Sequence, residues 1–203
     1  MHSLSELHLD ALSEVFNVGA GRAAASLSEI VGDEVRLSVP SVEVRKSSDL
    51  DLSIMGVDNA RFGAVHQTFS GTFEAEAILL FTEEHALEIV KDMMGSQISL
   101  EDLAEFEQEA MCELGNIILN ACLSAMADML NIPLNCSLPN YTVATTEEIF
   151  RRVSDDSDQP YVLLLHIDLA IEKRHSEGHL IFLLSSTSLQ DLIVQIDRFL
   201  GEV

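Results

Sequence analysis

Apolar residues recur at steps of three and four positions along two stretches of the chain, and each stretch predicts a long helix. The first helix is expected from Ser3, which has capping-box spacing to Glu6, as far as Gly32, a typical C-terminal cap. The second is expected from Ser99 to about Asn131. Its apolar positions repeat the spacing of the first. They are Leu9, Leu12, Phe16, Ala20, Ala23, Leu27 and Ile30 in the first helix and Phe106, Ala110, Leu114, Ile117, Ala121 and Ala125 in the second.

Alternating apolar and polar residues after each long helix predict strands and hairpins. The elements expected in the first half are a strand at 34–45 that Pro40 interrupts, a polar loop at 47–59, strands at 62–72 and 73–81, and a short helix at 82–94. Those expected in the second half are a strand through Pro139 to 144, a polar loop at 145–159, strands at 161–172 and 179–184, and an amphipathic helix at 185–200.

The two halves thus share one order of elements, which indicates an internal duplication with half-repeats at about 1–96 and 97–203. Helices and antiparallel hairpins occur without the strand-helix-strand alternation of a parallel sheet. We therefore predict an α+β fold with pseudo-twofold symmetry, in which two long and two shorter helices accompany a central antiparallel sheet. Because no Gly/Ser-rich linker separates the halves, residues 1–203 are expected to form a single domain.

Charge narrows the choice of partners. The 203 residues include 34 Asp and Glu but only 11 Lys and Arg, for a formal net charge of −23. A charge of this sign repels phosphate backbones and anionic lipids, so neither nucleic acid nor a membrane is an expected partner. Only three of the cations are lysines. Because salt screens the self-repulsion of such an acidic surface, we hypothesise a halophilic, archaeal source.

The expected compartment follows from the cysteines and from hydropathy. Cys112, Cys122 and Cys136 are odd in number and contain no C-x-x-C pair, which argues against a disulfide framework and a zinc ribbon. We find neither an apolar leader nor an uninterrupted apolar run as long as a spanning helix. A soluble, cytoplasmic protein is therefore expected.

Polar residues of the two long helices repeat more closely than any others. In each copy three of them stand at i, i+4 and i+7, and a proline follows the third after 23 positions. They are Asp10, Glu14, Asn17 and Pro40 in the first copy and Glu109, Glu113, Asn116 and Pro139 in the second. One such helix face alone is explained by solvation, but asparagine is a poor helix former, and its use at the same place twice calls for another reason.

Small residues accompany both triplets. Gly19, Ala20 and Gly21 follow Asn17, and Gly115 precedes Asn116. Short side chains allow another protein to approach closely, and they equally allow close packing of the two helices inside the core.

These residues resemble the signature of the CheC, CheX and FliY phosphatases of bacterial and archaeal chemotaxis. That signature is Asp or Ser, three residues, Glu, two residues, Asn, twenty-two residues, Pro. The first copy matches it at every defined position, and the second departs only in Glu109. The resemblance covers the whole chain and is closest to CheC proteins with two sites, because FliY carries an additional motor-switch domain.

The resemblance implies hydrolysis of the aspartyl phosphate on the response regulator CheY, which itself supplies the phosphorylated Asp, Mg²⁺ and a Lys. Asn17 and Asn116 would orient the attacking water, and Glu14 and Glu113 would pair with the regulator's Lys. Asp10 and Glu109 would shape the acidic face, and Pro40 and Pro139 would fix the supporting strand. No metal or other cofactor is expected on this chain. The alternative is a non-catalytic adaptor that binds the receptor deamidase CheD as well as CheY.

Four other signals are given structural interpretations. The run Gly19 to Ala24 fits a dinucleotide fingerprint but lies in a predicted helix without a βαβ unit. His175 and His179 have metal-pair spacing only if helical, whereas Gly178 predicts a hairpin turn there, so no metal site is expected. Cys112 and Cys122 are interpreted as core residues. The charged pairs 151–152 and 155–156 are interpreted as solvated loop positions.

Overall fold

The computed structural model describes residues 4–50, 60–95, 100–155, 160–171 and 174–201. The helices are α1 (Glu6–Val31), the 3₁₀ turn η1 (Ser47–Asp49), α2 (Glu83–Met94), α3 (Leu100–Leu130), α4 (Thr146–Asp155) and α5 (Ser186–Leu200). The strands are β1 (Val35–Lys46), β2 (Arg61–Gly71), β3 (Ala75–Thr82), β4 (Leu134–Cys136), β5 (Asn140–Thr145), β6 (Tyr161–Ile171) and β7 (Arg174–Leu184).

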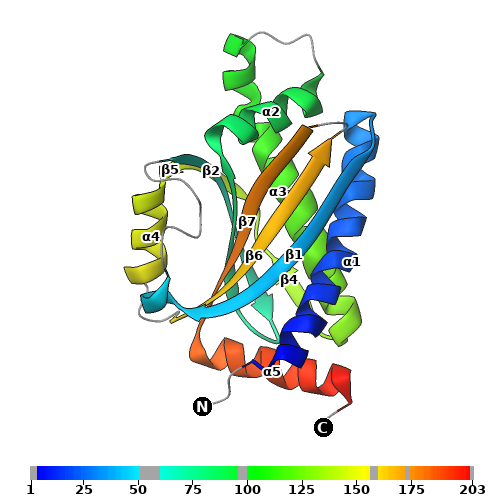
Figure 1. The fold of residues 1–203 in the computed structure, drawn as a ribbon, viewed down its shortest axis with the longest axis vertical. Coiled ribbons are helices and arrows are strands. Elements are labelled where there is room, and N and C mark those ends of the chain that lie inside the picture. Colours follow the sequence, from blue (N-terminus) through cyan, green and yellow to red (C-terminus); the bar gives the residue numbers. More distant parts are fainter. Residues whose placement is uncertain (1–3, 51–59, 96–99, 156–159, 172–173, 202–203) are drawn as a thin grey trace.

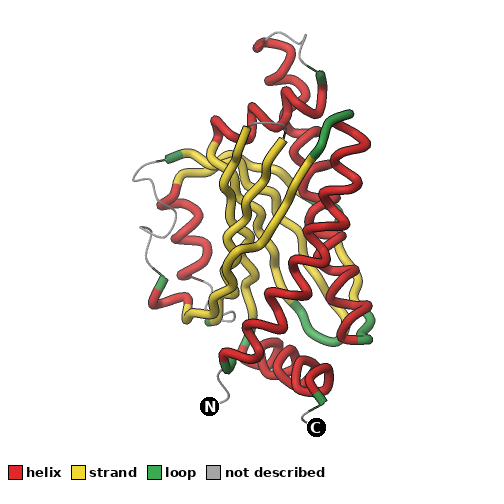
Figure 2. The backbone as a smooth tube through the Cα atoms, turned by 45° about the vertical axis from the view of Figure 1, so that its right-hand side comes forward, coloured by secondary structure: helices red, strands yellow, loops and turns green. Residues whose placement is uncertain are grey.

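All seven strands belong to one antiparallel sheet in the order β1-β6-β7-β3-β2-β4, with β5 also paired to β2. The α+β prediction is therefore confirmed. The long helices α1 and α3 lie side by side against one face of the sheet, and α4 lies against the other face (Figures 1 and 2). We call these the inner and the outer face.

The strand order agrees with the predicted duplication. β3 and β7, the last strands of the two halves, pair at the centre of the sheet. The strands that follow the long helix of each half pair with the other half, because β1 pairs with β6, and both β4 and β5 pair with β2. Each half thus supplies an edge of the other half's sheet. The duplication itself stays an interpretation.

Most apolar residues of the long helices and of the inner face form one core. Leu12 and Phe16 of α1 and Leu114 and Ile118 of α3 are fully buried in it. Phe106–Leu130 of α3 is long and apolar enough to cross a membrane by length and composition, but 56% of its most apolar window is buried inside the protein. Its hydropathy is accounted for by packing in the core.

Close packing explains two of the small residues. A Cβ on Gly19 would lie 2.6 Å from the Cα of Cys122, and one on Gly115 would lie 2.3 Å from Val65. These two glycines therefore let α1 approach α3 and α3 approach β2. Gly21 has open space around it.

The prediction of a loop at 145–159 was wrong. α4 occupies 146–155, and Ile149 is buried against the outer face, so the sheet supplies the apolar partner that a ten-residue helix needs. Thr145 and Glu148 have the sequence spacing of a capping box, which marks the start of this helix. In the structure the Thr145 hydroxyl accepts from the Glu148 N–H at 3.2 Å, and the Glu148 carboxylate accepts from the Thr145 N–H at 2.8 Å. The pair at 151–152 and residue 155 therefore lie on a helix, and residue 156 lies outside the described residues. Within the described residues three α-helices are shorter than α1 and α3.

Three smaller predictions also need correction. α1 is capped by Ser5, which forms its capping box with His8, and residue Ser3 lies outside the described residues. The strand through Pro139 is two strands, β4 and β5. His175 and His179 do not flank a turn, since both lie within β7, which begins at residue 174.

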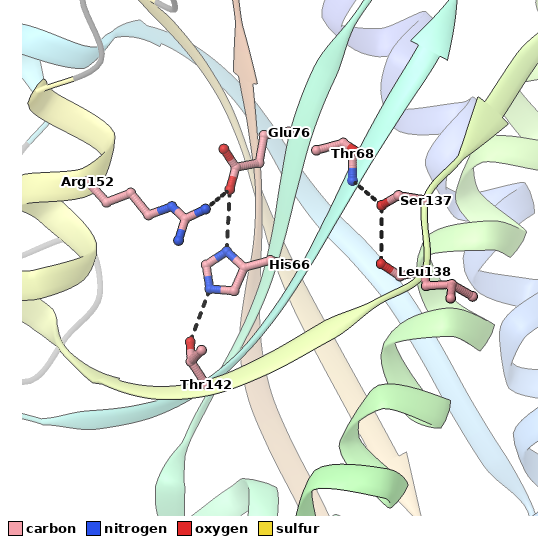
Figure 3. Close-up of polar contacts among 7 residues, drawn as sticks. All are labelled: His66, Thr68, Glu76, Ser137, Leu138, Thr142 and Arg152. Atoms are coloured by element: carbon pink, nitrogen blue, oxygen red, sulfur yellow. Dashed lines mark hydrogen bonds and ion pairs between the residues drawn. The ribbon is translucent and has the colours of Figure 1, made fainter.

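A charged cluster on the outer face holds α4 in place (Figure 3). Arg152 of α4 donates to Glu76 of β3, and Nδ1 of His66 on β2 lies 3.5 Å from the same Glu76 oxygen. The other ring nitrogen of His66 lies 3.2 Å from Thr142 Oγ1 on β5. The contact with His66, followed by the charge of Arg152, holds the pKa of Glu76 below its usual value.

Candidate active sites on the two long helices

The first motif lies on the exposed side of α1. Asp10, Glu14 and Asn17 are all exposed, while Leu12 and Phe16 between them point into the core. This is the division that the helical spacing predicts. The proline of this motif, Pro40, lies within β1.

Asn17 is tied to the backbone next to that proline. Its Oδ1 accepts from the Val39 N–H at 2.9 Å, and its Nδ2 donates to the Val39 carbonyl at 3.0 Å and to the Ser13 carbonyl at 2.9 Å. Because Val39 offers one donor and one acceptor, this contact fixes which way the Asn17 amide points.

The β1 register explains why an asparagine is needed there. Ser38 pairs with Asp168 and Ser41 with His166, so Val39 and Pro40 together oppose one residue of β6. This is a β-bulge, in which a residue loses its ladder partners. The Asn17 amide replaces them for Val39. The spacing from Asn17 to Pro40 therefore has a structural use in the first copy.

The second motif is arranged differently, because all four of its residues line one groove of about 680 Å³. Glu109, Glu113 and Asn116 come from α3, and Pro139 comes from the segment between β4 and β5. Glu113 is exposed and Asn116 is half-buried. The structure thus brings together the four residues that the sequence places in the second copy.

Asn116 is held from its own helix instead of from the strand. Its Oδ1 accepts from Asn120 Nδ2 at 2.7 Å. Oδ1 of Asn120 in turn accepts from the Cys136 thiol at 3.0 Å and from the amide of buried Gln67 at 3.4 Å. These donors fix the direction of the Asn120 amide, and through it the direction of Asn116.

The strand segment beside the groove is anchored to β2 (Figure 3). Oγ of Ser137 accepts from the Thr68 N–H at 3.0 Å and donates to the Leu138 carbonyl at 3.2 Å. Gln67 donates to the Ser137 carbonyl at 2.6 Å. With its backbone held in this way, Leu138 presents a side chain that is 89% exposed.

Apolar side chains form the rest of the groove. Four of them count among the large exposed hydrophobic residues of the described chain, namely Ile30 of α1, Met94 of α2, Phe106 of α3 and Leu138. A contiguous apolar surface beside two exposed carboxylates is typical of a protein-docking surface. The groove fits a partner that carries an apolar patch next to a cation.

The groove offers an amide and carboxylates as its reactive groups. Cys112 also lines it, but burial raises the pKa of this thiol, which therefore stays protonated at neutral pH. Cys122 is fully buried between the helices, and burial raises its pKa to about 12. Neither cysteine has the lowered pKa of a nucleophile, and an amide is suited to orienting a water molecule.

Sequence reasoning missed Asn120, Gln67 and Ser137. Asn120 stands four residues after Asn116, on the same helix face, and this spacing could have signalled it. The equivalent position in the first copy is Gly21, so the repeat itself did not point to Asn120. Gln67 and Ser137 reach the site only through pairing of β2 with β4, which no local pattern reveals.

Comparison with known proteins supports the family resemblance along most of the chain. The model of the CheC-like family matches residues 7–44, and that of the chemotaxis phosphatase CheX matches residues 64–162. The CheY-P phosphatase CheC of Bacillus subtilis is 22% identical over 96% of both chains. The resemblance to the CheC, CheX and FliY family is confirmed.

Two FliY proteins are also similar to this chain, one in sequence and one in fold. The flagellar motor switch phosphatase FliY of Bacillus subtilis is 25% identical over 75% of this chain, which corresponds to 40% of that protein. The crystal structure of Thermotoga maritima FliY has the same fold, with a TM-score of 0.78 and 20% identity over 98% of this chain and all of that one.

Proposed function

We propose that this protein hydrolyses the aspartyl phosphate of the response regulator CheY and thereby ends its signal. The observation that carries the proposal is the groove that gathers Glu109, Glu113, Asn116 and Pro139 beside an exposed apolar rim. The similarity to a CheY-P phosphatase over nearly the whole chain supports it.

In this mechanism Asn116 places the attacking water in line with the phosphorus atom. The bond from Asn120 uses one lone pair of the Asn116 carbonyl, and the second lone pair can accept a hydrogen bond from water. Glu113, one turn earlier on α3, pairs with a lysine of the regulator and sets the docking register. The regulator brings its own Mg²⁺, so this chain supplies positioning and needs no cofactor of its own.

The second copy should carry most of the activity. In the first copy both N–H groups and one lone pair of Asn17 are used by Ser13 and Val39. Water could bind there only after these bonds break or at the one remaining lone pair. The two sites therefore differ although their motifs agree.

Dephosphorylation of radiolabelled CheY tests the proposal. We expect N116A to lower the rate about tenfold or more and N17A to lower it much less, because lost positioning is costly in such reactions. An exposed asparagine outside both motifs provides the control, N135A, which should leave the rate unchanged. An unchanged rate in the N17A/N116A double variant would exclude the mechanism.

Binding measurements distinguish the proposed phosphatase from the alternative, a non-catalytic adaptor. A pull-down with CheY and CheD, with and without a phosphoryl mimic on CheY, reports whether the chain prefers the activated regulator. Capture of CheD together with no phosphatase activity in the wild-type protein would favour the adaptor. We expect preferential capture of activated CheY, because the phosphorylated regulator is the substrate of the proposed phosphatase.

A further inference from the structure

A second cluster of polar side chains lies on the outer face of the sheet, away from both motifs. It consists of His166 and Asp168 on β6 and Glu177 on β7, and we call it the histidine–carboxylate patch. Potential ligand atoms of these three side chains all lie within 4.8 Å of one another.

Strand register places the three side chains together. Asp168 pairs directly with Glu177, and His166 stands two positions before Asp168 and therefore on the same face. Further along the outer face, Leu164 and Ile181 are buried together with Ile149 of α4. The patch thus begins where the apolar surface covered by α4 ends.

The pairing of Asp168 with Glu177 places two carboxylates side by side, and Arg36 of β1 lines the same cavity. Like charges directly opposite each other destabilise an antiparallel pair, and here they occur in a chain of net charge −23. In the described part of the chain neither carboxylate forms an ion pair with a lysine or arginine. Asp168 lies instead beside His166, whose Nε2 is 3.3 Å from its Oδ1.

We propose that the histidine–carboxylate patch binds a divalent transition-metal ion such as Zn²⁺ or Co²⁺. One imidazole and two carboxylates form a mixed nitrogen and oxygen donor set. Zn²⁺ and Co²⁺ bind such a set well, whereas Mg²⁺ and Ca²⁺ prefer sites made of oxygen ligands alone. This differs from the expectation from sequence, which considered His175 and His179 and foresaw no metal.

The surroundings of the patch favour such a site. The His179 ring packs edge-on against His166 with ring centroids 5.2 Å apart, which restricts the orientation of the proposed ligand. Asp168 and Glu177 also line a cavity of about 500 Å³, which leaves room for water to complete the coordination. All three donors sit on paired strands, which fixes their spacing better than a loop would.

The position of the patch separates it from the phosphatase chemistry. α1 and α3, which carry the two motifs, cover the inner face, whereas the patch lies on the outer face. A metal there would cross-link β6 and β7 and stabilise the fold. It would not replace the Mg²⁺ of the regulator.

Calorimetric titration of the untagged full-length protein with CoCl₂ and ZnCl₂ tests the proposal, with thermal unfolding followed in parallel. We expect one ion bound per chain and a rise in the unfolding temperature. H166Q, D168N and E177Q should each weaken binding about tenfold or more, because each removes a ligand.

Two control variants remove one carboxylate and one imidazole elsewhere, E43Q on β1 and H85Q on α2, and both should bind the metal as the wild type does. Circular dichroism establishes that each variant is folded. Absence of binding to the wild type, or equal binding by the wild type and a folded D168N/E177Q variant, would overturn the proposal. Preference for Mg²⁺ or Ca²⁺ over Co²⁺ would overturn the assigned class of metal.

Discussion

An asparagine in the middle of a helix costs a few tenths to about 0.7 kcal/mol relative to alanine, and the two motif asparagines engage different neighbours. Asn17 bonds the backbone of Val39 at the bulge that Pro40 introduces. Asn116 bonds Asn120 on its own helix, one turn further on. The motif asparagine therefore bonds the backbone of a strand in the first copy, whereas in the second copy it lines an open groove.

Asn120 is predicted to be a positioning residue for Asn116. One neutral hydrogen bond contributes about 0.5–1.5 kcal/mol, so N120A should lower the rate of CheY dephosphorylation by a factor of about 2 to 13 in the N17A background. The affinity for activated CheY should stay the same, because Asn120 does not line the groove.

A double-variant cycle provides the control for this prediction. In the N116A background the change N120A should have no further effect, since the residue it positions is gone. An equal loss of rate with and without Asn116 would show that Asn120 acts on the stability of α3 and not on the amide.

At the scale of elements, the contact between α1 and α3 depends on one glycine. A Cβ at Gly19 would meet backbone atoms of α3, 2.6 Å from Cys122 Cα and 3.0 Å from the Ala121 carbonyl oxygen. Because backbone cannot move aside as a side chain does, G19A should lower the free energy of unfolding by about 1–3 kcal/mol despite its better helix propensity. Urea denaturation measures the change.

The neighbouring glycine of the same helix is the matched control. A methyl group on Gly21 would meet no atom of another element within 4 Å, so G21A should raise the free energy of unfolding by about 0.5–1 kcal/mol. Equal effects of the two substitutions would contradict the packing explanation.

The attachment of α4 should depend on pH. The contact with His66 and the charge of Arg152 lower the pKa of Glu76 below 4.5, so its charged form stabilises the folded state above that pH. This contribution of Glu76 to the free energy of unfolding should be lost as the pH falls through the pKa that Glu76 has in the folded state. E76Q should therefore cost roughly 1–2 kcal/mol at neutral pH and progressively less in acid.

Thermal unfolding of the wild type and E76Q between about pH 3 and 7 measures this difference, which is the linkage between protonation and folding. The exposed i,i+4 pair of Arg151 with Glu147 on the same helix provides a control, since E147Q should change stability by less than about 0.5 kcal/mol. A constant difference between wild type and E76Q across the pH range would refute the role assigned to Glu76.

Periodicity along the chain predicted both long helices, β1 with its break, and the elements α2, β6 and α5, because each has a clear pattern and defined ends. It failed at α4, where Thr145 and Glu148 form a capping box but a long polar run obscured the buried contact of Ile149. The four residues of the second motif line one groove, and the catalytic roles that the repeated spacing suggests for them stay a prediction. Local pattern could not reveal the support of that site by Gln67, because it comes from a strand more than 40 residues away in sequence.

At the scale of the whole molecule, the acidic charge is spread widely and few cations balance it. Most ion pairs of the described residues involve exposed side chains, such as Arg22 with Asp128 and Arg45 with Glu43. Pairs of this kind contribute about 0–1 kcal/mol each. Glu29, Asp33 and Glu34 add unfavourable charge near the end of α1, whose last turn holds no basic residue and carries the negative end of the helix dipole.

Salt should therefore stabilise this protein. Raising KCl from about 0.1 M to about 1 M shortens the Debye length from about 10 Å to about 3 Å, which screens repulsion among the 34 acidic residues more than it weakens the few exposed pairs. We expect the thermal unfolding midpoint to rise across this range. The variant E29Q/D33N/E34Q should unfold at a higher temperature than the wild type in low salt and should gain less from added KCl, because part of the repulsion is already removed. A midpoint that stays constant or falls with KCl would exclude both the repulsion argument and the halophilic source inferred from it.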